Sequence, residues 1–155
     1  MNSGKAPGTS IISAVKFFDA IGTGNDAGNN FIVIRYADVL LMYAEALNEV
    51  SYDATGTGDA FKYLNSVRAR AGVASLTPAQ LPDQASFRNA TLQERNLELA
   101  LEGERWFDLL RSGQAISALA AVGITVQPYQ LLYAVPQTEI DVINNPNNFP
   151  QNPGY

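Results

Sequence analysis

The chain has 155 residues, of which 46% are hydrophobic, and it carries a formal net charge of −5 with no cysteine and no histidine. This length is typical of one domain, or of a large piece of one, that buries a sizeable core without disulfides. The missing residue types exclude thiolate metal sites and histidine-based catalysis, so acid–base chemistry would depend on Asp, Glu, Lys or Tyr. The negative charge argues against a nucleic-acid partner, because phosphate binding needs a positive surface.

The first thirty residues predict no regular fold. Residues 1–10 are small and polar, and we expect them to be disordered or extended. Residues 11–18 are β-branched or aromatic and predict a strand or extended segment, whereas the Gly and Asn residues at 22–30 predict a loop without the spacing of a calcium site. The chain shows no apolar signal-peptide core and no run of about 18–20 apolar residues. We therefore expect either a cytosolic protein or part of a longer exported one.

Two amphipathic helices are predicted in the first half of the chain. In the first, over 34–50, spacings of three and four predict a core-facing stripe of Tyr36, Leu40, Tyr43, Leu47 and Val50. The opposite, solvated face is expected to hold Arg35, Asp38, Glu45 and Glu49. The second helix is expected to begin at Asp59 as N-cap and to stop at Gly72. Because a short loop joins them, we expect an antiparallel hairpin of tetratricopeptide-like shape.

The second half predicts one long helix followed by short elements. The long helix is expected to begin near Ser86 or Thr91, either of which is a plausible cap, and to run to about Arg111. A short helix over 114–121 and a short strand over 131–135, stopped by Pro136, follow. Five Asn and three Pro residues between 144 and 154 predict an irregular tail.

The segment 94–111 is the most unusual part of the predicted long helix, because eight of its eighteen residues are charged. Like-charged pairs such as Glu94–Glu98 and Glu98–Glu102 are unfavourable on a helix surface. We therefore expect outside partners for them, for which Arg35, Arg68, Arg70 or helix-terminal amides are candidates. Gly103 shares a helical stripe with core residues, which predicts that another element approaches the helix there.

Two interpretations of this charge pattern remain. Paired carboxylates such as Glu98 and Glu102 could serve as an acid–base site. Alternatively, the charges form a structural ion network that fixes how this helix crosses the first two. The apolar residues on the same helix, the absence of histidine and the matching arginines favour the network. Aromatic residues on the helix stripes are expected in the core, whereas Tyr52, Tyr129 and Tyr155 are freer to contact a ligand.

Four motifs in this chain resemble those of a known family. They are the segment 35–49, the segment 64–72, the spaced pairs Glu94-Arg95, Glu98-Leu99 and Glu102-Gly103 with Arg105-Trp106-Phe107-Asp108-Leu109, and the ending 151–155. Together they resemble the C-terminal region of the SusD/RagB family of outer-membrane nutrient-binding lipoproteins. The marker residues are expected to be structural rather than ligand-binding: Arg35, Glu94, Arg95, Glu98, Glu102, Gly103, Arg105, Trp106, Asp108 and Arg111.

The resemblance implies a mainly α-helical protein with tetratricopeptide-like hairpins, in which residues 31–155 form a C-terminal helical domain. It implies capture of an oligosaccharide or other nutrient at the surface of a Gram-negative outer membrane, together with a SusC-like TonB-dependent transporter. It implies no catalysis, no cofactor and no metal, and no ligand-binding residue can be transferred. Family members are about three times longer, so we expect a fragment without the lipid anchor, with Met1 as an expression start. The alternatives are a helical protein-interaction module without glycan binding and a glycosidase with paired carboxylates.

Overall fold

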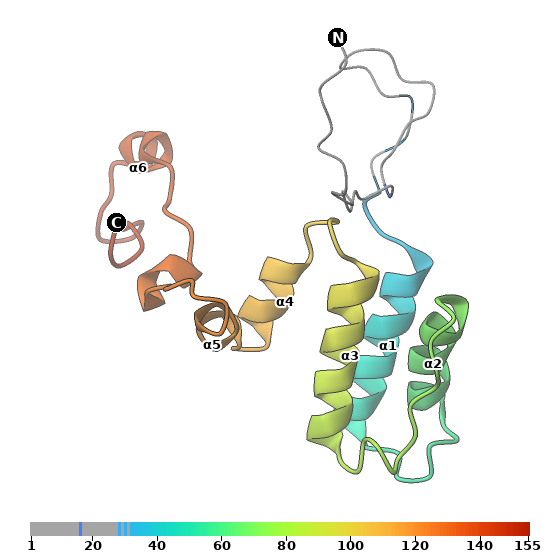
Figure 1. The fold of residues 1–155 in the computed structure, drawn as a ribbon. Helices are drawn as coiled ribbons and strands as arrows, with labels where there is room; N and C mark the ends of the chain where they lie inside the picture. Colours follow the sequence, from blue (N-terminus) through green and yellow to red (C-terminus); the bar gives the residue numbers. More distant parts are fainter. Residues whose placement is uncertain (1–15, 17–27, 29, 31) are drawn as a thin grey trace, which may run out of the picture. The chain divides into compact units, whose positions relative to one another are not determined.

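The computed structural model describes residues 16, 28, 30 and 32–155, and it divides the chain into a unit of residues 1–33 and a unit of residues 34–155. The predictions for residues 1–10 and for the loop at 22–30 fall outside the described residues, apart from Gly28 and Asn30, and so does the extended segment predicted at 11–18, apart from Lys16. The described part contains six α-helices, one short 3-10 helix and no strand (Figure 1), so the predicted mainly α class is confirmed.

Three helices lie side by side and form the core of the second unit. They are α1 (Tyr36–Val50), α2 (Asp59–Arg70) and α3 (Gln84–Glu98), with α1 in the middle (Figure 1). The ring of Phe61 meets the ring of Phe87 edge-on at 4.8 Å in the centre of this core. The remaining core residues are Leu41, Ala44, Ala60, Leu64, Val67 and Leu81. The predicted α1–α2 hairpin is present, whereas its tetratricopeptide-like character stays a prediction.

The core face predicted for α1 is correct only in part: Leu40 and Leu47 are partly buried and pack against the core, but the other members of the stripe do not form its centre. Its buried residues are Asp38, Leu41, Ala44 and Asn48, whereas Tyr36 and Tyr43 on the predicted stripe are 75% and 48% exposed. The reason is that α1 carries apolar residues around most of its circumference, so periodicity cannot select the face that packs. Contacts with α2 on one side and α3 on the other make that choice.

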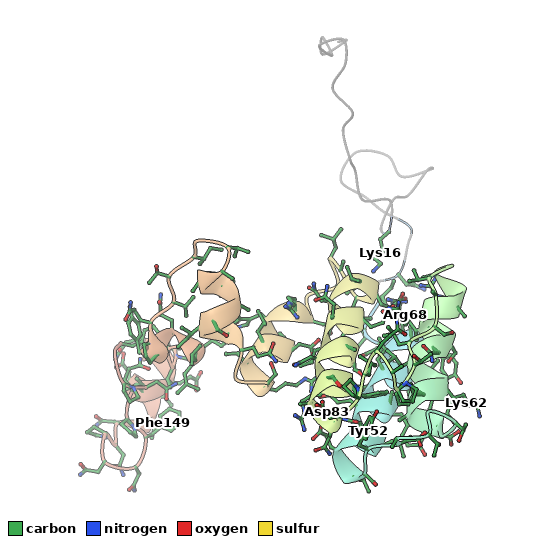
Figure 2. The ribbon with its side chains drawn as sticks, turned by 60° about the horizontal axis from the view of Figure 1, so that its bottom comes forward. Lys16, Tyr52, Lys62, Arg68, Asp83 and Phe149 are labelled. Carbon is green, nitrogen blue, oxygen red and sulfur yellow. The ribbon has the colours of Figure 1, made fainter. Side chains whose placement is uncertain are left out.

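Local hydrogen bonds explain where the helices begin and end. Gly72 has a φ of 73° and follows the last turn of α2, as predicted. The predicted caps at Asp59, Ser86 and Thr91 are wrong, because Gly58 precedes α2 and Asp83 caps α3 in a capping box with Ser86. Asp83 lies at the same end of the helical layer as Tyr52 (Figure 2), whose hydroxyl donates to the carbonyl of Leu81.

The predicted long helix is also wrong, because it is broken into two pieces. Helix α3 ends at Glu98, and a separate helix α4 (Arg105–Arg111) begins after a turn. Within that turn Leu101 has a φ of 70° and Gly103 a φ of 90°, which is the left-handed region that ends helices. A Cβ added at Gly103 would meet no atom within 4 Å, so this glycine is needed for the turn. The prediction that another element packs closely against Gly103 is wrong.

The replacement Gly103→Ala distinguishes the turn from a continuous helix by the sign of its effect. In a continuous helix, alanine would stabilise the protein by up to about 1 kcal/mol. At a φ of 90° we expect a destabilisation of about 1–2 kcal/mol instead, because the left-handed region strains a residue with a Cβ. Urea unfolding measures the difference, and an increase in the free energy of unfolding would contradict the turn.

Short elements follow α4, namely α5 (Ala115–Ala120), the 3-10 helix η1 (Pro128–Leu131) and α6 (Gln137–Ile143). The short helix at 114–121 is confirmed by α5, but the strand predicted at 131–135 is wrong. In this segment, the backbone groups form hydrogen bonds with side chains instead of with a partner strand. The amide of Gln151 bonds both the N–H and the carbonyl of Val135, and the amide of Asn152 donates to the carbonyl of Tyr133.

Two aromatic residues, Tyr129 of η1 and Tyr155 of the tail, also contact each other. Tyr129 and Tyr155 meet edge-on at 5.4 Å, and the hydroxyl of Tyr155 donates to the carbonyl of Leu132. Gly154 lets the two rings approach, since a Cβ there would come within 2.6 Å of the Tyr129 side chain. Both tyrosines therefore hold the end of the chain against the segment that follows η1.

Candidate functional site

The first part of the candidate site is a cluster of arginines around two glutamates of the charged segment. Arg35, just before α1, donates from Nε to Glu102 and from Nη1 to Glu98, each at 2.8 Å, and from Nη2 to the backbone carbonyl of Glu98. Arg70, at the end of α2, reaches the other carboxylate oxygen of Glu98 at 2.5 Å. The side chain of Glu98 is only 6% exposed, so two guanidinium groups hold a nearly buried carboxylate.

A third arginine binds a glutamate on the neighbouring turn of α3. Arg68 of α2 donates to Glu94 at 2.6 Å and to the carbonyl of Ala74 at 2.9 Å. The partners expected from the like-charge spacing, Arg35, Arg68 and Arg70, are thus all confirmed. Charge-assisted hydrogen bonds of this kind are about twice as strong as neutral ones. They outweigh repulsions of a few tenths of a kcal/mol along the helix.

The second part of the site is a buried chain of charges that joins α1, α3 and α4. Arg95 of α3 is 4% exposed and donates to both oxygens of Asp108, at 3.0 and 2.9 Å, and to Asp38 at 2.5 Å. Arg111 also binds Asp108, at 2.8 Å, and continues to Glu45. Each link of this chain lies between a carboxylate and a guanidinium, so the three helices are connected by paired charges.

The arginines stay charged throughout this arrangement. The hydrogen bond to Glu102 raises the pKa of Arg35, although burial acts in the opposite direction. Burial alone lowers the pKa of Arg95, but the hydrogen bonds to Asp108 and Asp38 outweigh it and leave the pKa above its ordinary value. The bonds to Glu45 and Asp108 likewise raise the pKa of Arg111. These cations are therefore fixed partners for the carboxylates and not groups that exchange protons near neutral pH.

Sequence reasoning missed two members of the buried chain, Asp38 and Glu45. Both were expected on a solvated face of α1, yet Asp38 is 8% exposed and both bind arginines. The signal was present in their spacing: Asp38, Leu41, Glu45 and Asn48 recur at three and four residues and form one face. Each acid on that face meets an arginine: Asp38 meets Arg95 of α3, and Glu45 meets Arg111 of α4.

Three marker residues lie outside the ion network. Gly103 forms the turn, and Arg105 makes no ion pair with any residue that the structure describes. Trp106, expected in the core, is half-buried in the first turn of α4. The neighbouring Leu97, Leu101 and Phe107 are exposed. The break after Glu98 causes these differences, since it removes the helical register on which the expectation rested.

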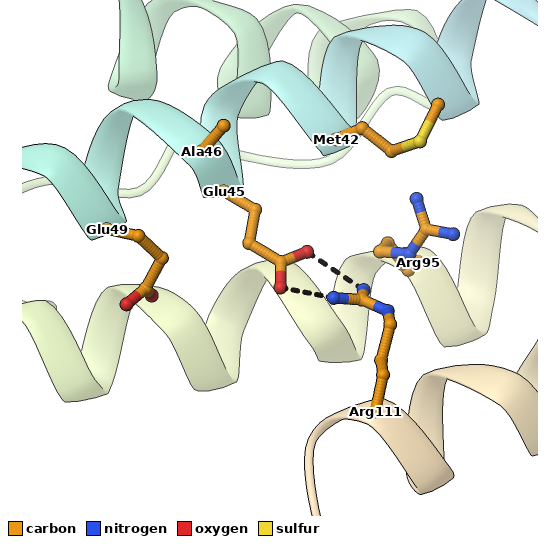
Figure 3. Close-up of a pocket in the computed structure, with 6 residues that line it drawn as sticks. All are labelled: Met42, Glu45, Ala46, Glu49, Arg95 and Arg111. Atoms are coloured by element: carbon orange, nitrogen blue, oxygen red, sulfur yellow. Dashed lines mark hydrogen bonds and ion pairs between the residues drawn. The ribbon is translucent and has the colours of Figure 1, made fainter.

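A pocket of about 360 Å³ lies beside the buried chain, between α1, α3 and α4 (Figure 3). Both carboxylate oxygens of Glu45 are bound by Arg111, and both of Glu49 are bound by Arg88. Its charged groups are thus already paired, and the rest of its lining comes from Met42, Ala46 and Arg95. In the described part of the chain, no group of three or more acids is placed to hold a metal ion.

The replacement Glu98→Gln tests the role of the first cluster. It keeps the shape of the side chain but removes the charge that holds Arg35 and Arg70. We expect the free energy of unfolding to fall by about 1.5–3 kcal/mol, the range for hydrogen bonds to charged groups. The matched control is Glu104→Gln, since Glu104 has no ion-pair partner among the described residues, and its effect should stay within about 0.5 kcal/mol. Equal stabilities of the two variants in urea would contradict the structural role of Glu98.

These features define the class of the protein. It is an all-helical protein in which arginines join the helices through nearly buried carboxylates. The model of the SusD family matches residues 2–155, and the chain belongs to this family. It is similar to SusD-like protein P2 of Formosa agariphila, with 36% identity over 85% of this chain and 27% of the relative. SusD-like protein P25 of the same organism is 37% identical over 74% of this chain and 22% of the relative.

Solved structures give the same result. A SusD homolog from Bacteroides thetaiotaomicron has a TM-score of 0.67 and 32% identity, covering 87% of this chain and 30% of the homolog. A laminarin-binding SusD-like protein has a TM-score of 0.56 and 35% identity, covering 79% of this chain and 23% of that protein. The chain therefore spans about a quarter of the length of these relatives. Within the residues described, no helix has the length and apolar character needed to cross a membrane.

Proposed function

We propose that this chain is the helical C-terminal part of a non-catalytic glycan-binding lipoprotein at the bacterial surface. The observation that carries the proposal is membership of the SusD family together with 35% identity to a SusD-like protein that binds laminarin. The charged segment supports the non-catalytic part. Its carboxylates accept hydrogen bonds from arginines of neighbouring elements, whereas an acid–base catalyst needs a carboxyl group that can exchange a proton with substrate.

The full protein would work with a SusC-like TonB-dependent transporter in nutrient uptake, held at the outer membrane by a lipid anchor. In this arrangement the ion network serves as scaffold. It fixes the crossing of α1, α3 and α4, so that surfaces on these helices keep a constant shape toward glycan or transporter. No cofactor or metal takes part.

The alternative function is a helical protein-interaction module that binds no glycan by itself. One observation favours it: several large apolar side chains of α1 are exposed, among them Tyr36 and Val50. Exposed apolar surface of this kind is typical of protein–protein contacts. The two functions are compatible in a longer chain, because a transporter is a protein partner.

Calorimetric titration of the 155-residue chain with laminarin oligosaccharides tests glycan binding. Trp106 is the only tryptophan, so its fluorescence reports changes near the turn between α3 and α4. We expect saturable heat without new reducing ends after prolonged incubation. Absence of heat with several glucans would instead support the interaction module. Release of reducing ends that is lost in the Glu98→Gln variant would contradict the non-catalytic proposal.

A further inference from the structure

The part of the chain after α4 differs from the preceding helices in its charge. Nineteen of the 78 residues at 34–111 are charged, whereas only Glu139 and Asp141 are charged among the 44 residues at 112–155. Ten of these 44 residues are Asn or Gln, and none is Lys or Arg. Anionic groups are bound most strongly by cationic side chains, which this part lacks, whereas amides donate to and accept from uncharged hydroxyl groups. The composition of this part therefore favours an uncharged ligand that is rich in hydroxyl groups.

Three tyrosines of this part keep much of their surface exposed. Tyr129, Tyr133 and Tyr155 are 41%, 68% and 53% exposed. Two hydrogen bonds bring the end of the chain onto the segment that carries the other two tyrosines. The hydroxyl of Tyr155 donates to the carbonyl of Leu132 at 2.9 Å, and the side-chain amide of Asn152 donates to the carbonyl of Tyr133 at 2.6 Å. The three tyrosines, which form what is called the tyrosine site below, therefore lie on segments that contact each other.

Two rings of the tyrosine site are held in place by the protein itself. The rings of Tyr129 and Tyr155 meet edge-on at 5.4 Å, and Gly154 packs against the side chain of Tyr129. Side chains that are already ordered lose less entropy when a ligand binds. Tyr133 has no such structural role, because its side chain makes no hydrogen bond or ring contact with a residue that the structure describes. Closure of the tail therefore explains the position of Tyr129 and Tyr155 but not the exposed ring of Tyr133.

We infer that the tyrosine site binds an uncharged polysaccharide, whose sugar rings stack on the tyrosine rings. The inference rests on the proposed glycan-binding function and gives it a location in this chain. A tyrosine offers a flat apolar face to the C–H groups of a sugar and a hydroxyl to its polar edge. The exposed Tyr36 of α1 is the competing stacking surface. A polypeptide segment is the competing occupant of the tyrosine site.

Hydroxyl-radical footprinting of the unmodified 155-residue chain tests the inference directly. Oxidation of each tyrosine is measured by mass spectrometry without glycan, with laminarin as an uncharged glucan, and with alginate as an anionic polysaccharide. We expect laminarin to lower the oxidation of Tyr133 and Tyr155 at least about twofold, because a stacked sugar covers one face of each ring. Tyr36 is 75% exposed and serves as the control for scavenging of radicals by the glycan. Equal protection of Tyr36 and the tyrosine site, or stronger protection by alginate, would overturn the inference.

Calorimetric titration of two variants with laminarin separates the tyrosine site from the proposed function. Tyr133→Ala should weaken binding at least about fivefold, as loss of a stacking ring does elsewhere, whereas the matched control Tyr36→Ala should bind like the original chain. If the original chain binds laminarin and Tyr133→Ala binds it equally well, with no protection of the site in footprinting, the inference is wrong and the proposed function stands. That result would also favour a polypeptide as the occupant. If the original chain binds no glucan, both the inference and glycan binding by this chain are contradicted.

Discussion

Replacing Arg95 by methionine is expected to lower the free energy of unfolding by about 3–5 kcal/mol, because breaking a buried ion pair leaves an uncompensated charge. Arg95 is 4% exposed, and its partners Asp38 and Asp108 are 8% and 3% exposed. Methionine fills much of the same volume, so the loss reflects the carboxylates and not a cavity: Asp38 loses its bond to Arg95, and Asp108 is left with Arg111. A domain is stable by only about 5–15 kcal/mol, so this single change approaches the limit of folding.

The matched control for this prediction is Arg88→Met. Arg88 also binds a glutamate of α1 with two hydrogen bonds, but the pair Arg88–Glu49 is about 40% exposed on both sides. Exposed ion pairs contribute about 0–1 kcal/mol, so this variant should unfold close to the original chain in urea. Comparable losses in the free energy of unfolding for Arg95→Met and Arg88→Met would show that burial does not determine how much these ion pairs contribute to stability.

Phe87→Ala is the second change with a large expected effect. The ring of Phe87 is fully buried and packs edge-on against Phe61 in the centre of the α1–α2–α3 layer. Its removal should cost about 3–5 kcal/mol, the sum of lost burial and the cavity that remains. Thermal unfolding followed by circular dichroism measures the shift.

Leu97→Ala provides the comparison on the same helix. Leu97 is 61% exposed, so its truncation should change the free energy of unfolding by no more than about 0.5 kcal/mol. If Phe87→Ala had an equally small effect, the core would not lie between α1, α2 and α3 as the structure places it.

The sequence was sufficient for the elements with strong local signals. Phe61, Leu64 and Val67 are apolar at helical spacing on a helix with a polar outer face, a pattern that indicates the packing side, and all three are buried in the core. Gly72 stops α2 because a residue in the left-handed conformation follows the last turn. The arginines that pair with the charged segment were also predictable, because the like charges at spacing four required partners from elsewhere.

The sequence was insufficient to predict the structure where one residue pattern was compatible with two different structures. Gly103 fits the stripe of a continuous helix as well as a turn, and only the backbone, with Leu101 also at positive φ, distinguishes them. On α1, apolar residues on every side conceal the packing face, and the acids Asp38 and Glu45 look like solvated ones until their arginines are placed. Both errors concern contacts between distant segments, which no local pattern contains.

The same contacts support the proposal that the most charged stretch of this SusD-family chain is a scaffold. Its acids serve α1 and α2 through Arg35, Arg68 and Arg70, and its aspartate joins α4 to α1 through Arg95. A charge network of this type specifies one arrangement of helices, because any other arrangement would leave buried charges unpaired. Under this proposal, ligand-binding groups are expected outside the network.

A double-mutant cycle between Arg95 and Asp108 tests this account most directly. The free energy of unfolding is measured by urea for Arg95→Met, for Asp108→Leu, for the double variant and for the original chain. If the buried pair holds α3 and α4 together, the double variant should be more stable than the sum of the single losses predicts, with a coupling energy of about 2 kcal/mol. Single effects that add to within about 0.5 kcal/mol would show that the two side chains do not act as a pair, and would contradict the scaffold role of the network.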